Sequence, residues 1–397
     1  MNVYRYVTPL IVILLLTVLF IGVVTIHSTI CASASDPLEG ASLKYRGFNY
    51  IAGWWTTPPG DLSSSTSRAS LDALKSTGAN WVAVDVWWDM SSPTSNTISS
   101  VSPYTQTDAQ VIDAINDIHT RGMSVMLKPM VLVGPCPIAP TNPAAWFASY
   151  ATFINHYARI AQKNHVELFC VGCELDGMDN SYYSNWSTVI SGVRAIYNGP
   201  LTYAPMWGGY KSVVFWALLD YAGIDAYFPL SNAQTPSVNN LVTGWSSYTV
   251  SGTVLNWLQE IETWQATINK PVIFTEIGCL PVDYGASDSF NSNGPYNPQV
   301  QANYYEAALQ AFANKPWFAG MFWWAWYSYP TAGGAGNIID SNGNVTNWTP
   351  QNRPAQSVLT ADWQGIPTQR REVPAISSTP TATSPTGPRR IGPRRAS

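Results

Sequence analysis

Two apolar stretches, each ending near a glutamate, constrain the fold of this chain more than any other feature. Residues 166–178 read VELFCVGCELDGM, an almost uninterrupted apolar run that stops at Glu174. About a hundred residues later, residues 270–278 read KPVIFTEIG, with Glu276 at the end of the run. Runs of this kind are typical of strands buried on both faces of a parallel sheet. The sequence therefore predicts a parallel sheet with a carboxyl group at the C-terminal end of two strands.

Strand and helix patterns alternate through the body of the chain, from about residue 43 to residue 363. Strands are predicted at 44–49, 81–86, 124–128, 166–174, 201–204, 221–227, 270–276 and 317–324. Helices are predicted at 68–77, 108–121, 142–163, 186–197, 213–219, 254–267, 300–313 and 354–363. Eight strand-then-helix units in one body predict an α/β fold, a single (β/α)8 TIM barrel over residues 35–368.

Residues 1–34 are predicted to be an N-terminal signal rather than part of the barrel. Arg5 precedes an apolar run over residues 10–26, and a small-residue segment, Cys31-Ala-Ser-Ala34, follows that run. This order is typical of a secretory signal peptide, while the length of the apolar run leaves an uncleaved signal anchor as the alternative. Both interpretations predict an extracellular or cell-surface protein, with membrane contact only through this segment if it is uncleaved.

Residues 369–397 form a Pro-, Ser-, Thr- and Arg-rich tail that is predicted to be disordered, because its composition cannot bury enough apolar surface to fold. The tail holds six arginines and one glutamate, and Arg5 lies in the signal segment. The body therefore keeps 13 basic and 23 acidic residues. A nucleic-acid-binding domain would have the opposite balance, so no nucleic-acid partner is expected.

The composition of the chain favours a neutral, ring-shaped ligand. Charged residues make up 11% of the chain, against about a quarter in ordinary soluble proteins. Aromatic residues reach 13%, including 18 tryptophans. Tryptophan also fills protein cores, so these residues have two interpretations. An exported protein with few charges and many aromatic side chains suits a polysaccharide, whose apolar ring faces stack on indoles.

Ligand chemistry on a (β/α)8 barrel gathers at the C-terminal ends of the strands. The side chains predicted there are Asn49, Asp85, Trp87, Trp88, Lys128, Glu174, Trp207, Asp225, Tyr227, Glu276, Trp323, Trp324 and Trp326. We predict substrate binding by Asn49, Trp87, Trp88, Lys128, Trp207, Asp225, Trp323 and Trp326. One of Trp323 and Trp324 must face the helices, because neighbours on a strand alternate. Lys128 could instead simply pair with one of the aspartates.

The cysteines predict no metal site. Cys170 and Cys173 form a C-x-x-C pattern, which can indicate redox or metal chemistry. Residues three apart on a regular strand point to opposite faces, however, and no second C-x-x-C or nearby histidine completes a zinc site. A disulfide that involves Cys136 is possible but cannot be deduced.

Two glutamates at the ends of buried strands suit the acid and the nucleophile of a glycosidase, because an ionised glutamate is rarely buried unless it is paired or functional. The segments GCEL (172–175), LTYAPMW (201–207), GIDAYFPL (223–230), KPVIFTEIG (270–278) and MFWWAW (321–326) resemble glycoside hydrolase family 113. That family consists of retaining β-1,4-mannanases of the (β/α)8 clan A. The resemblance covers nearly the whole body, in the right order.

This resemblance implies that Glu174 is the general acid/base, that Glu276 is the nucleophile and that Tyr227 hydrogen-bonds the nucleophile. The clan usually has asparagine immediately before the acid/base, whereas Cys173 stands there in this chain. The resemblance implies a retaining endo-β-1,4-mannanase that acts on a polysaccharide without cofactor or metal. The N-terminal segment adds the expectation of export, and a monomer is expected. The alternatives are another clan A glycanase, acting on glucan, xylan or galactan, and a barrel that only binds polysaccharide.

Overall fold

Eight parallel strands form the central sheet of the computed structural model, which describes residues 43–53, 60–133, 137–290, 294–329 and 347–365. The strands are β1 (Tyr45–Ile51), β2 (Trp81–Asp89), β3 (Ser124–Leu132), β4 (Leu168–Cys173), β5 (Leu201–Ala204), β6 (Ala222–Asp225), β9 (Val272–Ile277) and β10 (Phe318–Tyr327). Their order is β5-β4-β3-β2-β1-β10-β9-β6. The edge strands meet where the Asp225 N–H donates to the Pro205 carbonyl at 2.9 Å. The predicted (β/α)8 barrel is confirmed.

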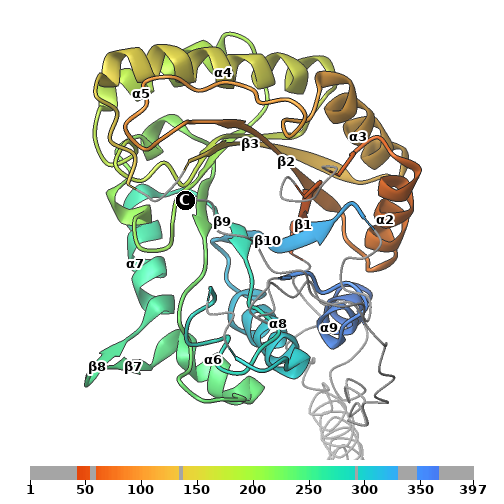
Figure 1. Ribbon diagram of the computed structural model, residues 1–397. Coiled ribbons are helices and arrows are strands. Elements are labelled where there is room, and N and C mark those ends of the chain that lie inside the picture. Colours follow the sequence, from red (N-terminus) through yellow and green to blue (C-terminus); the bar gives the residue numbers. More distant parts are fainter. Residues whose placement is uncertain (1–42, 54–59, 134–136, 291–293, 330–346, 366–397) are drawn as a thin grey trace, which may run out of the picture.

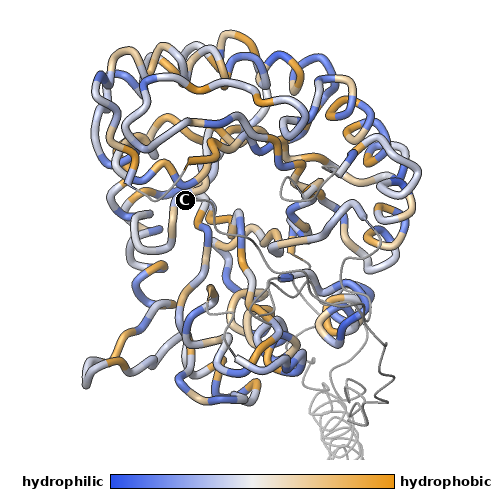
Figure 2. Tube along the Cα trace, viewed as in Figure 1, coloured by the Kyte–Doolittle hydropathy of each residue, from blue (hydrophilic) through white to orange (hydrophobic). Residues whose placement is uncertain are grey.

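Helices surround this sheet (Figure 1). They are α2 (Ser65–Ser76), α3 (Asp108–Thr120), α4 (Pro143–Lys163), α5 (Tyr183–Arg194), α6 (Val238–Ser246), α7 (Trp257–Ile268), α8 (Pro298–Phe312) and α9 (Pro354–Trp363). Hydrophobic and hydrophilic residues alternate along them (Figure 2). None of the helices in the described ranges has both the length and the apolar character needed to cross a bilayer. The predicted signal segment, the predicted tail and Cys136 lie outside the described residues.

The structure differs from the predicted elements mainly between β5 and β9. Two short 3-10 helices, η1 (Tyr210–Ser212) and η2 (Trp216–Leu218), replace the helix predicted at 213–219. The prediction also missed α6 and the hairpin of β7 (Tyr248–Val250) and β8 (Thr253–Leu255). Helix α6 contains asparagine, threonine and glycine, which are poor helix formers, and it begins at a capping box made by Ser237 and Asn240. Local capping and packing therefore override its weak intrinsic propensity.

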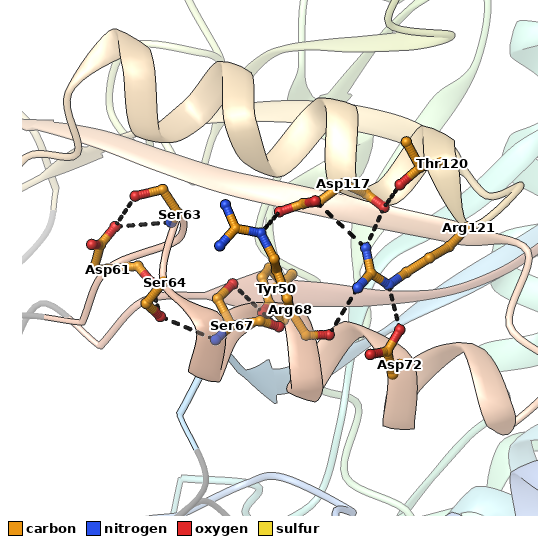
Figure 3. Close-up of polar contacts among 10 residues, drawn as sticks. All are labelled: Tyr50, Asp61, Ser63, Ser64, Ser67, Arg68, Asp72, Asp117, Thr120 and Arg121. Atoms are coloured by element: carbon orange, nitrogen blue, oxygen red, sulfur yellow. Dashed lines mark hydrogen bonds and ion pairs between the residues drawn. The ribbon is translucent and has the colours of Figure 1, made fainter.

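Polar contacts join α2 and α3 on the outside of the barrel (Figure 3). Arg121, at the end of α3, donates to Asp72 of α2 at 2.7 Å, and Arg68 of α2 pairs with Asp117 of α3 at 3.0 Å. Exposed pairs of this kind each stabilise a fold by only about 0–1 kcal/mol. The helices are held mainly by buried side chains that pack on the sheet, which include Leu71, Leu74, Ile115 and Ile118.

The interior of the barrel changes from apolar to polar along the strands. An apolar cluster draws residues from every barrel strand except β6, and its members are Tyr45, Trp81, Ala83, Met126, Leu168, Cys170, Cys173, Ala204, Ile273 and Phe322. On β2, Asp85 follows Trp81 and Ala83 with the same parity, so it faces the same interior. Asn49 follows Tyr45 in the same way on β1. The alternation of side chains along these strands therefore places polar residues in the barrel interior, closer to the C-terminal ends of the strands than the apolar cluster.

Candidate active site

Glu276 on β9 lies at the centre of the polar interior. The Tyr227 hydroxyl, from just beyond β6, donates to Glu276 Oε2 at 2.5 Å. The Lys128 ammonium, from β3, contacts Glu276 Oε1. Glu276 is buried, so these two donors replace the water that would otherwise solvate its carboxylate. The arrangement orients Glu276 and compensates its negative charge.

Lys128 is completely buried and joins several interior groups. Its Nζ donates to Asn49 Oδ1 at 3.2 Å and lies 3.8 Å from Asp85 Oδ1. Asn49 Nδ2 donates to the backbone carbonyls of Thr275 at 3.0 Å and Phe322 at 3.3 Å, which fixes its amide. Burial alone would lower the pKa of Lys128, but the surrounding acidic groups, with Asp85 first, raise that pKa well above its usual value. Lys128 therefore stays a cation, and it does pair with an aspartate as the sequence allowed.

Asp225, the last residue of β6, is a second buried acid beside Glu276. The Thr275 hydroxyl donates to Asp225 Oδ1 at 2.8 Å, and the Cys173 thiol lies 3.5 Å from Oδ2. Burial, followed by the negative charge of Glu276, raises the pKa of Asp225 to about 8. Asp225 is therefore protonated at neutral pH and adds a neutral hydrogen-bonding group to the site.

Replacing Asp225 with asparagine is expected to change how stability depends on pH. A native-state pKa near 8, against an ordinary value near 4, means that the native protein holds a proton that the unfolded chain has released. The free energy of unfolding of the wild type should therefore fall, relative to Asp225→Asn, by about 1.4 kcal/mol per pH unit between about pH 4 and 8. Urea unfolding of both proteins at pH 5, 6.5 and 8 measures this difference. Parallel pH profiles would contradict the prediction.

Glu174 follows β4 directly and has a left-handed backbone conformation, with φ of 48°. Its N–H donates to the Ala204 carbonyl of β5 at 2.7 Å. Burial of the carboxyl group, followed by its interactions with the neighbouring acidic groups Asp225 and Glu276, raises the pKa of Glu174 well above its usual value. A carboxylic acid that keeps its proton beside a paired carboxylate suits an acid and a nucleophile in one site.

Aromatic side chains surround these carboxyl groups. The Trp324 ring of β10 lies 5.4 Å from Lys128 Nζ. Trp207 and Trp324 pack, partly buried, against a cluster that contains Tyr227 and Trp348. The Phe290 ring lies 5.0 Å from the Tyr227 ring, and the residue is 61% exposed. These contacts place exposed or partly exposed aromatic surface next to the carboxyl groups, as stacking on a sugar requires.

The structure does not bring four of the predicted tryptophans to this surface. Trp323 is fully buried and stacks on Tyr305 of α8 at 3.7 Å. Trp326 is fully buried and donates its indole N–H to Ser70 Oγ of α2 at 2.9 Å. Trp87 is also fully buried, and Trp88 packs against side chains of α4. Their indole faces are occupied by the protein, so we do not assign sugar binding to them.

A bulge in β10 explains why Trp324, and not Trp326, faces the interior. Phe48 of β1 pairs with Trp323, whereas Tyr50 pairs with Trp326, so β10 contains one extra residue between these pairs. An extra residue interrupts the regular alternation of side chains. Trp323 and Trp326 consequently both face the helices, although they are three positions apart and a regular strand would turn them to opposite sides. Substrate binding was predicted from the sequence for Trp323 and Trp326, whereas the structure turns Trp324 towards the interior.

Alanine replacements of Trp323 and Trp324 are expected to affect different properties, stability for Trp323 and substrate binding for Trp324, although the two residues are neighbours. Trp323→Ala should lower the free energy of unfolding by about 3–5 kcal/mol, because it empties a packed site. Trp324→Ala should affect stability less and should raise KM for a polysaccharide about tenfold, the equivalent of one lost contact of about 1.4 kcal/mol. Urea unfolding and steady-state kinetics of both variants test this. A raised KM in Trp323→Ala alone would contradict it.

The cysteines show the same effect of an irregular strand. Cys170 and Cys173 both belong to the interior cluster, because the pairing of β4 with β5 shifts register between them. The expectation that they face opposite sides was therefore wrong, although both are free thiols in the structure. Cys173, Asp225 and Glu276 place ligand atoms within 4.8 Å of one another, which could suit a metal ion. Lys128 already supplies positive charge to this group, so we assign no metal to it.

Comparisons with known proteins agree with this geometry. A family model described as Glycoside Hydrolase Family 113 matches residues 52–336. The fold is similar to that of the GH113 beta-mannanase AaManA from Alicyclobacillus acidocaldarius in complex with ManMIm, at 24% identity and a TM-score of 0.67, over 83% of this chain and 99% of that chain. A second solved GH113 beta-1,4-mannanase is 23% identical, with a TM-score of 0.64, over 81% of this chain and 99% of the other.

A more distant structural similarity is to a beta-glucuronidase from Faecalibacterium prausnitzii, at 18% identity and a TM-score of 0.55, over 83% of this chain and 50% of that chain. A search of curated protein sequences finds no match. Similarity at these identities shows the barrel fold, whereas the family model decides the family. Since that model spans most of the chain, the protein is a glycoside hydrolase and belongs to glycoside hydrolase family 113.

Proposed function

We propose that this glycoside hydrolase is an endo-acting β-1,4-mannanase that retains the configuration of the anomeric carbon. The observation that carries the proposal is the contrast between its two glutamates. Glu276 is contacted by an ammonium and a phenol, whereas burial raises the pKa of Glu174 well above its usual value. One carboxyl group is therefore prepared to attack and the other to donate a proton.

In the proposed reaction, Glu276 attacks the anomeric carbon while Glu174 gives its proton to the departing glycosidic oxygen. The bond to that oxygen breaks, and a glycosyl ester of Glu276 forms. Glu174 then takes a proton from water, whose oxygen attacks the anomeric carbon and releases Glu276. Two displacements at one carbon restore the original configuration, and no cofactor is consumed.

The remaining site groups support this cycle. Tyr227 holds Oε2 of Glu276 while Lys128 contacts Oε1, so the nucleophile has a fixed orientation. Cys173 stands where the clan usually has the asparagine that binds the sugar 2-hydroxyl, and Asp225 Oδ2 lies 3.5 Å from its thiol, so a protonated Asp225 can donate that hydrogen bond instead. Trp207, Trp324 and Phe290 offer the apolar surface for sugar rings.

A reducing-sugar assay of the purified protein tests the proposed substrate. Mannan, glucomannan, xylan and β-glucan are compared under identical conditions, and the products are separated by size. The proposal expects the fastest release from mannan or glucomannan, with oligosaccharides as early products. Faster release from xylan or β-glucan would replace mannan as the substrate. Binding to polysaccharide without release of any sugar would overturn the enzymatic proposal.

We also propose that the protein is exported by its N-terminal apolar segment. The small-residue site at Ala32-Ser-Ala34 predicts that the mature protein begins near Ser35. N-terminal sequencing of protein collected from the culture medium measures this start. Protein that begins at Met1 and is recovered with membranes would support the uncleaved anchor instead.

A further inference from the structure

The backbone that carries Glu174 is held by two consecutive residues of β5. The Glu174 N–H donates to the Ala204 carbonyl at 2.7 Å, and the Leu175 N–H donates to the Tyr203 hydroxyl at 3.0 Å. The left-handed conformation of Glu174, with φ of 48°, is unfavourable for a residue other than glycine and persists only where its surroundings enforce it. These two hydrogen bonds are the contacts that hold it from the side of β5.

The Tyr203 hydroxyl has a second partner that sets its direction. It donates to Asp179 Oδ2 at 2.9 Å, and both residues are buried. A phenol has a single hydrogen, and a carboxylate can only accept. With its hydrogen committed to Asp179, the phenol oxygen has a lone pair free to accept from Leu175. Asp179 thereby acts on the Glu174 backbone through Tyr203.

Asp179 is itself tied to the same turn. Its N–H donates to the Leu175 carbonyl at 3.1 Å, and its own carbonyl accepts from the Val214 N–H at 3.1 Å. Burial raises the pKa of Asp179 to about 6, although the hydrogen bond from Tyr203 by itself lowers that pKa. Before the turn, a side chain on Gly172 would lie 2.4 Å from the Tyr150 hydroxyl, so the strand end has little space to move.

We propose that Tyr203 and Asp179 are positioning residues that aim the Glu174 carboxyl group at the glycosidic oxygen. Neither residue is assigned contact with substrate; both act by fixing the backbone on either side of Glu174. This inference rests on the proposed role of Glu174 as the proton donor. Loss of the Tyr203 hydroxyl should therefore impair protonation of the leaving group more than any other step.

The test compares Tyr203→Phe with a matched control, Tyr197→Phe, in the full chain. Tyr197 is also a buried tyrosine, and its hydroxyl donates to the Val166 carbonyl at 2.8 Å. Val166 precedes the N-terminal end of β4, whereas Glu174 follows its C-terminal end. Each protein is assayed for kcat/KM on an unactivated β-1,4-mannooligosaccharide and on a 2,4-dinitrophenyl β-mannobioside. The second substrate has a leaving group that departs without protonation.

Tyr203→Phe is expected to lose about 10²-fold in kcat/KM on the oligosaccharide, the scale of a misplaced catalytic group, and less than about threefold on the dinitrophenyl substrate. Tyr197→Phe should leave the ratio of the two values unchanged. Asp179→Asn should also lose more kcat/KM on the oligosaccharide than on the dinitrophenyl substrate, with a smaller loss than Tyr203→Phe. It provides a second test if Tyr203→Phe folds poorly. Equal losses on both substrates would show a merely structural role.

The outcomes separate this inference from the proposed function. If the wild type hydrolyses both mannosides and neither Tyr203→Phe nor Asp179→Asn is selective, the positioning inference fails and the proposed function stands. If the wild type hydrolyses a different glycan, the comparison is repeated on the matching glycosides, and the inference is decided there. If the wild type hydrolyses no glycoside, the proposed function fails and the inference fails with it.

Discussion

Replacing Glu276 with alanine is expected to abolish turnover on every glycoside, whatever its leaving group. The variant has no carboxylate to attack the anomeric carbon, and a better leaving group cannot replace a missing nucleophile. The loss in kcat should be roughly 10⁴-fold or more, the scale seen when a catalytic nucleophile is removed. Steady-state rates on mannan and on an activated aryl mannoside measure it.

The control for this variant is Glu262→Ala. The Glu262 side chain is about half exposed and lies 3.9 Å from Lys315, so its loss should leave turnover unchanged. Glu276→Ala also removes a buried charge that contacts Lys128, and its folding must be checked by thermal unfolding. A folded Glu276→Ala variant with nearly full activity on either substrate would remove Glu276 from the mechanism.

Replacing Glu174 with alanine is expected to give a loss that depends on the leaving group. General acid catalysis contributes about 10²–10⁴-fold, so hydrolysis of mannan should fall by that factor. An activated aryl mannoside should still form the glycosyl ester of Glu276, because its leaving group needs no proton. The ester should then accumulate, since the variant also lacks the base that activates water.

Azide provides the decisive measurement on Glu174→Ala. It needs no general base, so it should restore turnover of the activated substrate and release the β-glycosyl azide, which nuclear magnetic resonance identifies. An α-glycosyl azide would contradict retention. The retaining mechanism also predicts a separation of about 5–5.5 Å between the two carboxyl groups, against about 6.5–9.5 Å for inversion.

The strands and the identities of the site carboxyl groups were predictable from the sequence because both depend on local patterns. Buried parallel strands are continuous apolar runs, and a polar residue at the end of such a run stands out. The prediction of β5 at 201–204 agrees with the structure at both ends. Asn49, Lys128, Asp225, Tyr227 and Glu276 were all predicted, and the structure places them in one connected group.

The directions of side chains near the strand ends were not predictable. The parity rule holds along a regular strand, and it separated Trp323 from Trp324 correctly. It failed at Cys170 and Cys173, where β4 shifts register against β5. A bulge depends on how two strands pair, and therefore on residues distant in sequence. The contact of Tyr203 with Leu175 and Asp179 is non-local in the same way, and no motif in the sequence indicated it.

The extra residue in β10 has a consequence for comparing related sequences. Within residues 323–326, three of the four positions are tryptophan, and they differ in which side of the strand they occupy. An alignment that shifts a one-residue gap within this segment would keep a tryptophan matched to a tryptophan and lose nothing in its score. It would nevertheless equate the interior indole of Trp324 with one that packs on the helices. Relatives should therefore be superimposed by structure at this strand before the role of a tryptophan in one protein is assigned to a tryptophan in another.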